Sequence, residues 1–321
     1  MRKIIKTLLG IGGAFCLIGA LLFSIGFTSG GTKYVHDTNL NSMNAQEDNK
    51  ESANRFTLKK TEIPDFTSLN INLEDSDLNI EESPNEKSYI EYAQATKDKK
   101  NPVSYSIENG TLTLKEAGNT GASYYINVDI SFLQAALSSK NIEDYTKESS
   151  KYENYVTLYL PKDKLVSSAK IYLGYGDFYV KNATFDTTNI KLDDGDFDAN
   201  TLTANSGKLT FSYGDCDLQK ASLGNISLTS KDGDLTVNEL TLSGKTKIAL
   251  SYGDAEITLN DSTKKVSGFD LATHYGTITA SGLNGNKTVD EDDDVNTFQS
   301  DSKDGKTKLA IDSKDGDITV K

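Results

Sequence analysis

Six aspartates occupy one position of a repeated turn motif, and no other residues of this 321-residue chain are so regularly placed to act together. Each follows a glycine, as in YGDFYV at 175–180 and DGDFDA at 194–199. If the repeats stack like strands of a sheet, neighbouring carboxylates lie about 5 Å apart. Like charges repel by about 1 kcal/mol at about 4 Å in water, so each carboxylate needs a compensating partner. This Asp ladder consists of Asp177, Asp196, Asp215, Asp234, Asp254 and Asp317.

Two kinds of partner suit the Asp ladder. Backbone N–H groups of the turn can donate hydrogen bonds to each carboxylate, whose charge then faces water. Alternatively, calcium can bridge adjacent repeats, because carboxylates are hard oxygen ligands. The candidate calcium ligands are Asp177, Asp196, Asp215, Asp234 and Asp254. The segment DDGDFD at 193–198 has no glycine at its sixth position and no distal glutamate, both of which an EF-hand loop requires. The sequence therefore favours hydrogen bonding, and it predicts no bound metal and no cofactor.

The residue before each motif glycine forms a second column, the Tyr/Asp column. It contains Tyr175, Asp194, Tyr213, Asp232, Tyr252, Tyr275 and Asp315. One hypothesis is a strip that binds sugar or peptide through aromatic faces and carboxylate acceptors. The other hypothesis, which the sequence favours, is that tyrosine prevents a second acidic ladder from lying beside the first.

Motifs for enzymatic chemistry are absent from the sequence. GKT at 244–246 and 305–307 lacks the further glycine of a phosphate-binding loop. The two histidines, His36 and His274, have no evident catalytic partner. Some polysaccharide lyases are β-helices with clustered Asp and a basic residue, which leaves a carbohydrate-active enzyme as the alternative. Arg55 is the only arginine beyond the N-terminal segment, so we expect a non-enzymatic protein.

A short repeat with a nearly constant period predicts the fold. The motif glycines are Gly176, Gly195, Gly214, Gly233, Gly253, Gly276 and Gly316, at successive intervals of 19, 19, 19, 20, 23 and 40. The positions five before and four after each glycine are apolar in every repeat, and polar residues lie between the apolar positions. Such alternation on both sides of a glycine turn is typical of short strands with one buried face. A third apolar pair, such as Ala183 with Phe185, predicts a third strand in each repeat.

We therefore predict an all-β fold, a parallel β-solenoid of 19–20-residue rungs whose apolar columns stack into one core. An antiparallel meander or sandwich is the alternative. The same template fits around Ser76 and Gly110, so the domain is predicted to span 61–321. Residues 131–152 break the alternation and predict an insertion. An acidic loop near 284–306 is expected at the C-terminal end of the stack, where charge discourages edge-to-edge aggregation.

The N-terminal segment predicts a single-pass membrane anchor. Residues 8–27 form an uninterrupted run without a charge, long enough to cross a hydrocarbon core as a helix. The basic residues of segment 1–7 place the N-terminus in the cytoplasm and the rest of the chain outside. Residues 28–60 are polar and typical of a stalk. The alternative is a cleaved signal peptide, for which Ser24 and Gly26 are small residues near a cleavage point.

Charge and helix patterning limit the partners. Gly12, Gly19 and Gly26 share one face of the predicted helix, which is compatible with a homodimer in the membrane. The net charge is −13, and segment 1–27 contributes +3, so segment 28–321 carries −16. Such a surface repels phosphate polymers and disfavours nucleic-acid binding. The expected partner is an envelope component or surface ligand, which the sequence does not identify.

The order of these features resembles one known family. LYLP at 158–161 is followed, after a short spacer, by serial rungs of the form [YD]-G-D-[FL]-x-V, all behind an N-terminal membrane helix. This order is similar to the bacterial putative-adhesin family of β-strand-repeat proteins, formally a domain of unknown function. The resemblance covers about 61–321 and implies a β-solenoid at the cell envelope with no known activity. We therefore expect a membrane-anchored surface protein that displays the solenoid as an adhesin-like binding scaffold.

Overall fold

The computed structural model describes residues 54–96, 101–117, 154–290, 292 and 294–321. The chain divides into two units, Met1–Asn54 and Arg55–Lys321. The predicted membrane helix at 8–27, the glycines on its face and the predicted insertion at 131–152 lie outside the described residues. Within the described ranges, no helix is long and apolar enough to span a membrane.

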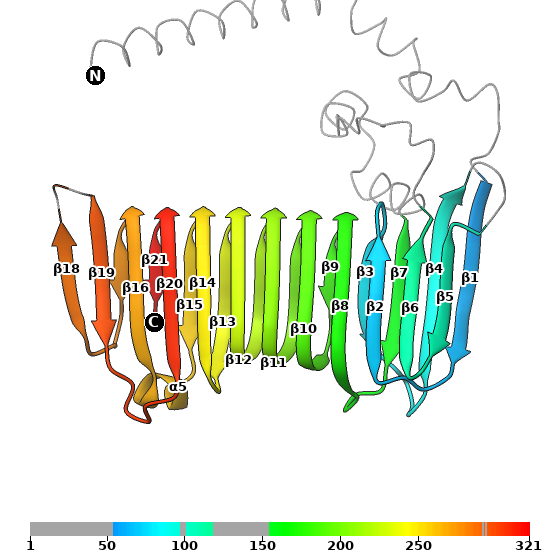
Figure 1. Cartoon of the computed structure of the whole chain (residues 1–321), viewed down its shortest axis with the longest axis horizontal. Coiled ribbons are helices and arrows are strands. Elements are labelled where there is room, and N and C mark those ends of the chain that lie inside the picture. The colour runs from blue at the N-terminus through cyan, green and yellow to red at the C-terminus, as the bar shows by residue number, and fades with distance from the viewer. Residues whose placement is uncertain (1–53, 97–100, 118–153, 291, 293) are drawn as a thin grey trace, which may run out of the picture. The chain divides into compact units, whose positions relative to one another are not determined.

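The described residues form one sheet of 21 strands and a short helix, α5 (Asp261–Val266), so the domain is nearly all β (Figure 1). The first strands are β1 (Asn54–Ile63), β2 (Ser68–Leu73), β3 (Asp77–Glu82), β4 (Ser88–Thr96), β5 (Val103–Glu108), β6 (Thr111–Glu116) and β7 (Tyr155–Leu160). The central strands are β8 (Leu165–Tyr175), β9 (Phe178–Val180), β10 (Ala183–Asp194), β11 (Phe197–Tyr213), β12 (Cys216–Asp232), β13 (Leu235–Leu242), β14 (Lys245–Tyr252) and β15 (Ala255–Leu259). The last strands are β16 (Gly268–Tyr275), β17 (Ile278–Ala280), β18 (Asn286–Asp290), β19 (Val295–Ser300), β20 (Lys308–Asp315) and β21 (Ile318–Val320).

The central rungs pair in parallel, and each is offset from the next by one repeat of the sequence motif. Between β11 and β12 the paired residues are Phe197 with Cys216, Leu202 with Ala221, and Leu209 with Leu228. All three pairs lie within two continuous strands of 17 residues each, so the structure does not divide these repeats into the three short strands that the sequence predicts. The parallel register also shows that these repeats stack as solenoid-like rungs and not as an antiparallel meander.

The apolar columns of the repeat face inward and stack into one core. The residues that stand five positions before a motif glycine each expose at most 1% of their surface. They are Ile171, Ile190, Leu209, Leu228, Ile248, Leu271 and Ile311. Phe178 and Phe197, on adjacent rungs, stack with ring centroids 5.0 Å apart. Since burying one such side chain contributes about 1.5–3 kcal/mol, the stacked columns are the main source of stability.

From Gly176 onward, each rung turns at a glycine because successive turns approach too closely for a larger residue. Gly195 has a φ of 137°, which L side chains rarely adopt. A Cβ atom on Gly195 would lie 2.3 Å from the carbonyl oxygen of Gly176 in the adjacent rung. The motif glycine therefore lets the turns stack at the same spacing as the strands.

The C-terminal rung lies inside the stack and not at its end. β20 and β21 pair with β14 and β15 on one side and with β16 and β17 on the other. Ile311 is thus placed between Ile248 and Leu271. In Figure 1 the red strand β20 stands between the yellow β14 and the orange β16.

Helix α5 accounts for this order. Asn260 caps the helix, because its side chain accepts a hydrogen bond of 2.8 Å from the backbone N–H of Thr263. The chain between β15 and β16 passes through α5 and skips one rung position. The vacant position is filled by β20 and β21, whose two edges are then both paired.

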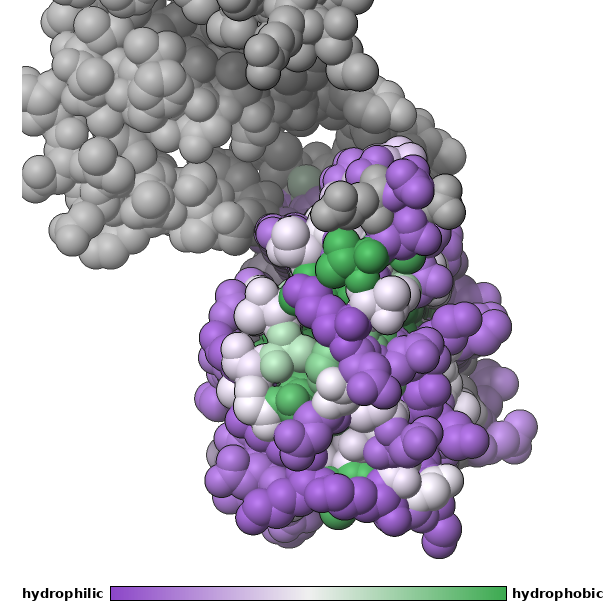
Figure 2. Space-filling model, turned by 90° about the vertical axis from the view of Figure 1, so that its left-hand side faces the viewer, coloured by the Kyte–Doolittle hydropathy of each residue, from purple (hydrophilic) through white to green (hydrophobic). Residues whose placement is uncertain are grey.

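The segment 284–306, expected as an acidic loop, instead contains the antiparallel strands β18 and β19, which extend the sheet beyond β16. Lys287 Nζ donates to the carbonyl oxygen of Ile278 at 2.7 Å, and Asn296 Nδ2 donates to that of Gly276 at 2.7 Å. These two side chains therefore donate hydrogen bonds to carbonyl groups at the open edge of the sheet beside β17. Seen from this end, apolar areas are small and separated by hydrophilic residues (Figure 2). A hairpin, and not a loop, therefore caps the stack.

The early rungs are confirmed around Ser76 and corrected around Gly110. β2 and β3, which flank Ser76, pair in parallel with β8 and β9. Gly110, in contrast, belongs to the turn of an antiparallel hairpin between β5 and β6. Asn109 and Gly110 have φ values of 49° and 73°, as an Asn-Gly hairpin turn requires. β1 begins at Asn54, so the end of the predicted stalk at 28–60 is a strand.

Candidate functional site

The motif turns line up along one side of the stack, which we call the turn edge. In Figure 1 it follows the row of arrowheads of β8, β10, β11, β12, β14, β20 and β16. In spatial order its glycines are Gly176, Gly195, Gly214, Gly233, Gly253, Gly316 and Gly276. The turn edge therefore brings the Asp ladder and the Tyr/Asp column together on neighbouring rungs.

Each carboxylate of the Asp ladder accepts a hydrogen bond from a backbone N–H of the next rung. The N–H of Asp196 donates to Oδ1 of Asp177, and the N–H of Asp215 donates to Oδ1 of Asp196, both at 2.8 Å. The same bond recurs at 2.7–2.9 Å along the whole turn edge, from the carboxylate of Asp77 to the N–H of Thr277. Backbone donors thus satisfy the ladder, but they come from the neighbouring rung. Each aspartate links two rungs.

The five candidate calcium ligands are arranged in a row, with one carboxylate on each rung. In the part of the chain that the structure describes, no group of three or more His, Cys, Asp or Glu residues is arranged to hold a metal ion. One oxygen of each carboxylate already accepts a backbone hydrogen bond. A cation bound here would have to share the other oxygens of successive rungs, so calcium bridging stays a hypothesis for experiment.

The Tyr/Asp column alternates strictly in space, although it does not in sequence. Tyr252 and Tyr275 are consecutive members of the column along the chain, but the inserted rung places Asp315 between them. The order along the turn edge is Tyr175, Asp194, Tyr213, Asp232, Tyr252, Asp315 and Tyr275. Tyrosine therefore recurs at every second rung, with a carboxylate on each rung between.

These side chains are exposed and available. Tyr175 exposes 60% of its surface, Tyr213 57%, Tyr252 60% and Tyr275 67%. Among the described residues, no hydrogen bond or ion pair engages the hydroxyl groups of these tyrosines. The same is true of the carboxylates of Asp194, Asp232 and Asp315. The column thus presents aromatic rings and unpaired acceptors to solvent.

A family model described as Toastrack DUF4097 matches residues 66–321, a range that includes every rung of the turn edge. The chain belongs to this family. The match covers both the early rungs around Ser76 and the inserted C-terminal rung. None of the curated proteins compared with the sequence matches it significantly.

Three solved structures are similar to the Toastrack domain over most of their length. A putative cell adhesion protein from Clostridium sporogenes ATCC 15579 is 14% identical, with 83% of this chain and 98% of that chain covered and a TM-score of 0.38. A putative adhesin from Bacteroides fragilis NCTC 9343 is 10% identical, with coverages of 84% and 97% and a TM-score of 0.40. A putative adhesin from Parabacteroides distasonis ATCC 8503 is 10% identical, with coverages of 83% and 97% and a TM-score of 0.39. At these values the three structures do not indicate what this chain binds.

A second acidic pair lies beside the turn edge of the Toastrack domain. Asp198 and Asp217 are register partners on adjacent rungs, two positions after Asp196 and Asp215 of the Asp ladder. Asp198 is exposed, but partial desolvation by its neighbours raises its pKa, and the negative charges of Asp217, Asp196, Asp177 and Asp215 raise it further. The turn edge therefore concentrates negative charge, which favours a cationic ligand.

A partly buried carboxylate that the sequence did not single out, Glu116, lies at the N-terminal start of the turn edge. Glu116 Oε2 accepts the backbone N–H groups of Glu74 at 2.8 Å and Asp75 at 3.0 Å, and Oε1 accepts the side-chain amide of Gln94 at 2.8 Å. Burial is the main cause that raises the pKa of Glu116. In the Toastrack domain, Glu116 thus accepts hydrogen bonds from the turn at Glu74 and Asp75, which precedes the first aspartate of the Asp ladder in the stack. The sequence could have indicated this, because Glu116 stands two positions after the inward-facing Leu114 and alternate residues of a strand share one face.

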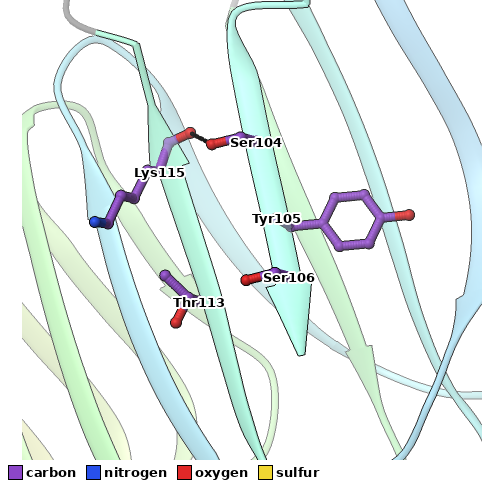
Figure 3. Close-up of a pocket in the computed structure, with 5 residues that line it drawn as sticks. All are labelled: Ser104, Tyr105, Ser106, Thr113 and Lys115. Carbon is purple, nitrogen blue, oxygen red and sulfur yellow. Dashed lines mark hydrogen bonds between the residues drawn. The ribbon is translucent and has the colours of Figure 1, made fainter. Parts of the chain in front are cut away.

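A hollow on the β5–β6 hairpin of the Toastrack domain is lined by Ser104, Tyr105, Ser106, Thr113 and Lys115 (Figure 3). The Ser104 hydroxyl donates to the carbonyl oxygen of Lys115 at 3.4 Å, and the Tyr105 ring points away from Lys115. The lining contains no carboxylate, histidine or cysteine. It therefore lacks the pair of groups that general acid–base chemistry needs.

Proposed function

We propose that this chain is a non-enzymatic surface protein whose Toastrack domain is an adhesin-like binding scaffold, with the turn edge as its binding surface. The observation that carries the proposal is the row of four exposed tyrosines that alternate with unpaired carboxylates. Aromatic side chains gathered on an exposed surface are typical of interaction sites. The turn edge is the place in the described domain where such side chains form a regular array.

Charge spacing alone does not account for the tyrosines. A serine or asparagine before each second glycine would separate the carboxylates equally well and would not expose an aromatic ring. Of the eight large hydrophobic side chains that are exposed among the described residues, four are the tyrosines of this column. Tyrosine provides a large and rigid contact area at a low cost in conformational entropy. We therefore prefer the binding hypothesis to the charge-spacing interpretation that the sequence favours.

A non-enzymatic role is supported by the state of the reactive side chains. The ladder carboxylates already accept backbone hydrogen bonds. Cys216 is buried, and burial raises the pKa of its thiol, which leaves an unreactive core residue. His274 is exposed on β16, and Arg55 lies in β1 at the other end of the sheet. These observations do not favour the alternative of a polysaccharide lyase, which would need acids and a basic residue together.

We also propose that residues 8–27 anchor the protein in the cell membrane and that the Toastrack domain lies outside the cell. The support is the uncharged run itself, preceded by basic residues in segment 1–7. A homodimer through Gly12, Gly19 and Gly26 is compatible with this anchor. Protease added to intact cells is expected to remove the domain, and complete protection of the domain would contradict the topology.

The binding proposal is tested with cells that display the full chain. Replacing Tyr213 and Tyr252 together by serine is expected to abolish most of the adhesion that the wild-type chain confers on surfaces coated with envelope or host extracts. Tyr105→Ser, which removes an exposed tyrosine outside the turn edge, is the matched control. Unchanged adhesion by the double variant, at equal surface display, would overturn the turn edge as the binding surface.

A further inference from the structure

The period of the Tyr/Asp column restricts the ligand. Adjacent strands of a sheet lie about 4.7–4.9 Å apart, so tyrosines on every second rung repeat at about 9.4–9.8 Å. Tyr175 and Tyr275 are six rungs apart in the stack, which corresponds to roughly 28–29 Å. A ligand that uses the whole turn edge must therefore be extended and must itself repeat at this distance.

A polypeptide in the polyproline II conformation has this repeat. It rises about 3.1 Å per residue with three residues per turn, so equivalent side chains recur at about 9.3 Å on the same face. A β-strand covers nearly the same distance in three residues, about 10 Å, but its successive side chains alternate between faces. Every third residue of a strand would thus point alternately toward and away from the turn edge. Of these two extended conformations, only polyproline II presents one residue in three to every carboxylate of the column.

The charge of the turn edge restricts the ligand further. Asp194, Asp232 and Asp315 alternate with the tyrosines, and the carboxylates of the Asp ladder lie beside them. The lysines directly before the column are Lys231 and Lys314, and they form no ion pair with it within the described chain. The ligand must therefore carry positive charge at the same repeat as the aspartates.

We propose that the turn edge binds an extended polypeptide in the polyproline II conformation that carries lysine or arginine at every third residue. The cationic side chains pair with Asp194, Asp232 and Asp315, and the intervening residues, proline above all, pack on the tyrosine rings. Pro-rich segments dock on aromatic-lined surfaces because their conformation is already ordered before binding. This inference rests on the proposed binding function and specifies its ligand class.

The test uses the full chain in detergent and a fluorescent peptide of four Pro-Pro-Lys units. A peptide of the same composition with its four lysines grouped at one end is the control. We expect the periodic peptide to bind at least about tenfold more tightly than the control, because only the periodic peptide can place lysines opposite Asp194, Asp232 and Asp315 at the same time. Affinity should rise with the number of repeats until the peptide matches the roughly 28–29 Å of the turn edge.

Variants assign the contacts. Tyr213→Ser with Tyr252→Ser should weaken the periodic peptide about tenfold or more, whereas Tyr213→Phe with Tyr252→Phe should retain binding, since the ring and not the hydroxyl makes the contact. Asp232→Asn should weaken binding and reduce its dependence on salt. All positions are exposed, and circular dichroism will verify that each variant is folded.

The outcomes separate this inference from the proposed function. Equal binding of the two peptides would show unspecific charge attraction and would overturn the inference. Selective binding of a cationic amino-sugar oligomer in place of either peptide would also overturn it, and would leave a glycan as the ligand. If neither ligand binds while cell adhesion still requires Tyr213 and Tyr252, the peptide assignment fails and the binding scaffold stands. If adhesion does not require these tyrosines, the proposed function itself fails.

Discussion

Oδ1 of Asp254 lies 2.7 Å from the backbone nitrogen of Asp317, which follows it by 63 residues in the chain. The bond is the same as the one that links Asp196 to Asp177, 19 residues apart. The Asp ladder therefore continues without interruption through a rung that comes from the end of the chain. The C-terminal segment is an internal part of the stack, and the alternation of the Tyr/Asp column depends on it.

Removal of residues 308–321 should consequently damage the domain severely. The deletion removes four buried aliphatic side chains, Leu309, Ile311, Ile318 and Val320, whose burial contributes about 6–12 kcal/mol in total at about 1.5–3 kcal/mol each. Limited proteolysis should cleave β16 to β19 rapidly, and the melting temperature should fall. Asp312→Ser, an exposed change in the same rung, should have almost no effect. If the truncated chain melted like the intact one, the inserted position of β20 would be wrong.

The inward register is tested by two adjacent residues of β12. Leu228 is 1% exposed, so Leu228→Asp buries an unpaired charge and should destabilise the domain by at least about 3 kcal/mol. Thr229 points to the other face, beside Thr210 and Ala249, so Thr229→Asp should change the free energy of unfolding by less than about 0.5 kcal/mol. Chemical denaturation measures both values. Similar losses for the two variants would show that the strand faces are assigned incorrectly.

The Asp ladder predicts a difference between two substitutions of Asp215. Asp215→Ala removes the acceptor of the Asp234 N–H, a bond of 2.8 Å, and should cost about 1–2 kcal/mol. Asp215→Asn keeps a side-chain oxygen at the same place and removes one charge from the row, so it should be nearly neutral. Urea denaturation measures the free energy of unfolding of both variants. A stability of Asp215→Ala equal to that of the wild type would mean that the hydrogen bond contributes nothing.

The raised pKa of Asp198 predicts a dependence on pH. A carboxyl whose pKa is higher in the folded state binds more protons there than in the unfolded chain, so stability falls as pH rises above the ordinary value of 3.8. Asp198→Asn removes this loss and should stabilise the domain at pH 7, by at most about 1 kcal/mol because the side chain is exposed. The gain should vanish below pH 3.8. Asp312→Asn controls for the loss of one charge, and an equal gain from it would exclude the specific effect at Asp198.

Calcium should hardly change the stability of the protein, since backbone donors already satisfy the ladder. A cation that bridged the rungs would add RT ln(1 + [L]/Kd), about 2.7 kcal/mol at a hundredfold excess over Kd. We expect the melting temperature to differ little between a chelator and millimolar calcium. A large rise that magnesium at equal ionic strength does not reproduce would support bridging. The double variant Asp196→Asn with Asp215→Asn should then lose the response.

The sequence by itself determined which residues face the core and where each rung turns. Alternation around each motif glycine is a local property, because strand side chains point to opposite faces in turn. Ile171, Leu209 and Ile248 are accordingly all buried as predicted. The same local pattern led to a wrong prediction of a solenoid turn at Gly110. A hairpin and a solenoid turn both place a glycine between two strands of alternating residues.

Only the tertiary structure decided the order of the rungs and the donors of the Asp ladder. The rungs present similar inward columns and the same edge hydrogen bonds, so the repeat motif does not by itself specify which rung is the neighbour of which. The choice depends on α5, which takes the chain past one position, and on the β18–β19 hairpin, which closes the end. Asp315 thereby comes to lie between Tyr252 and Tyr275, and the regular alternation of the turn edge results from packing between segments far apart in the chain.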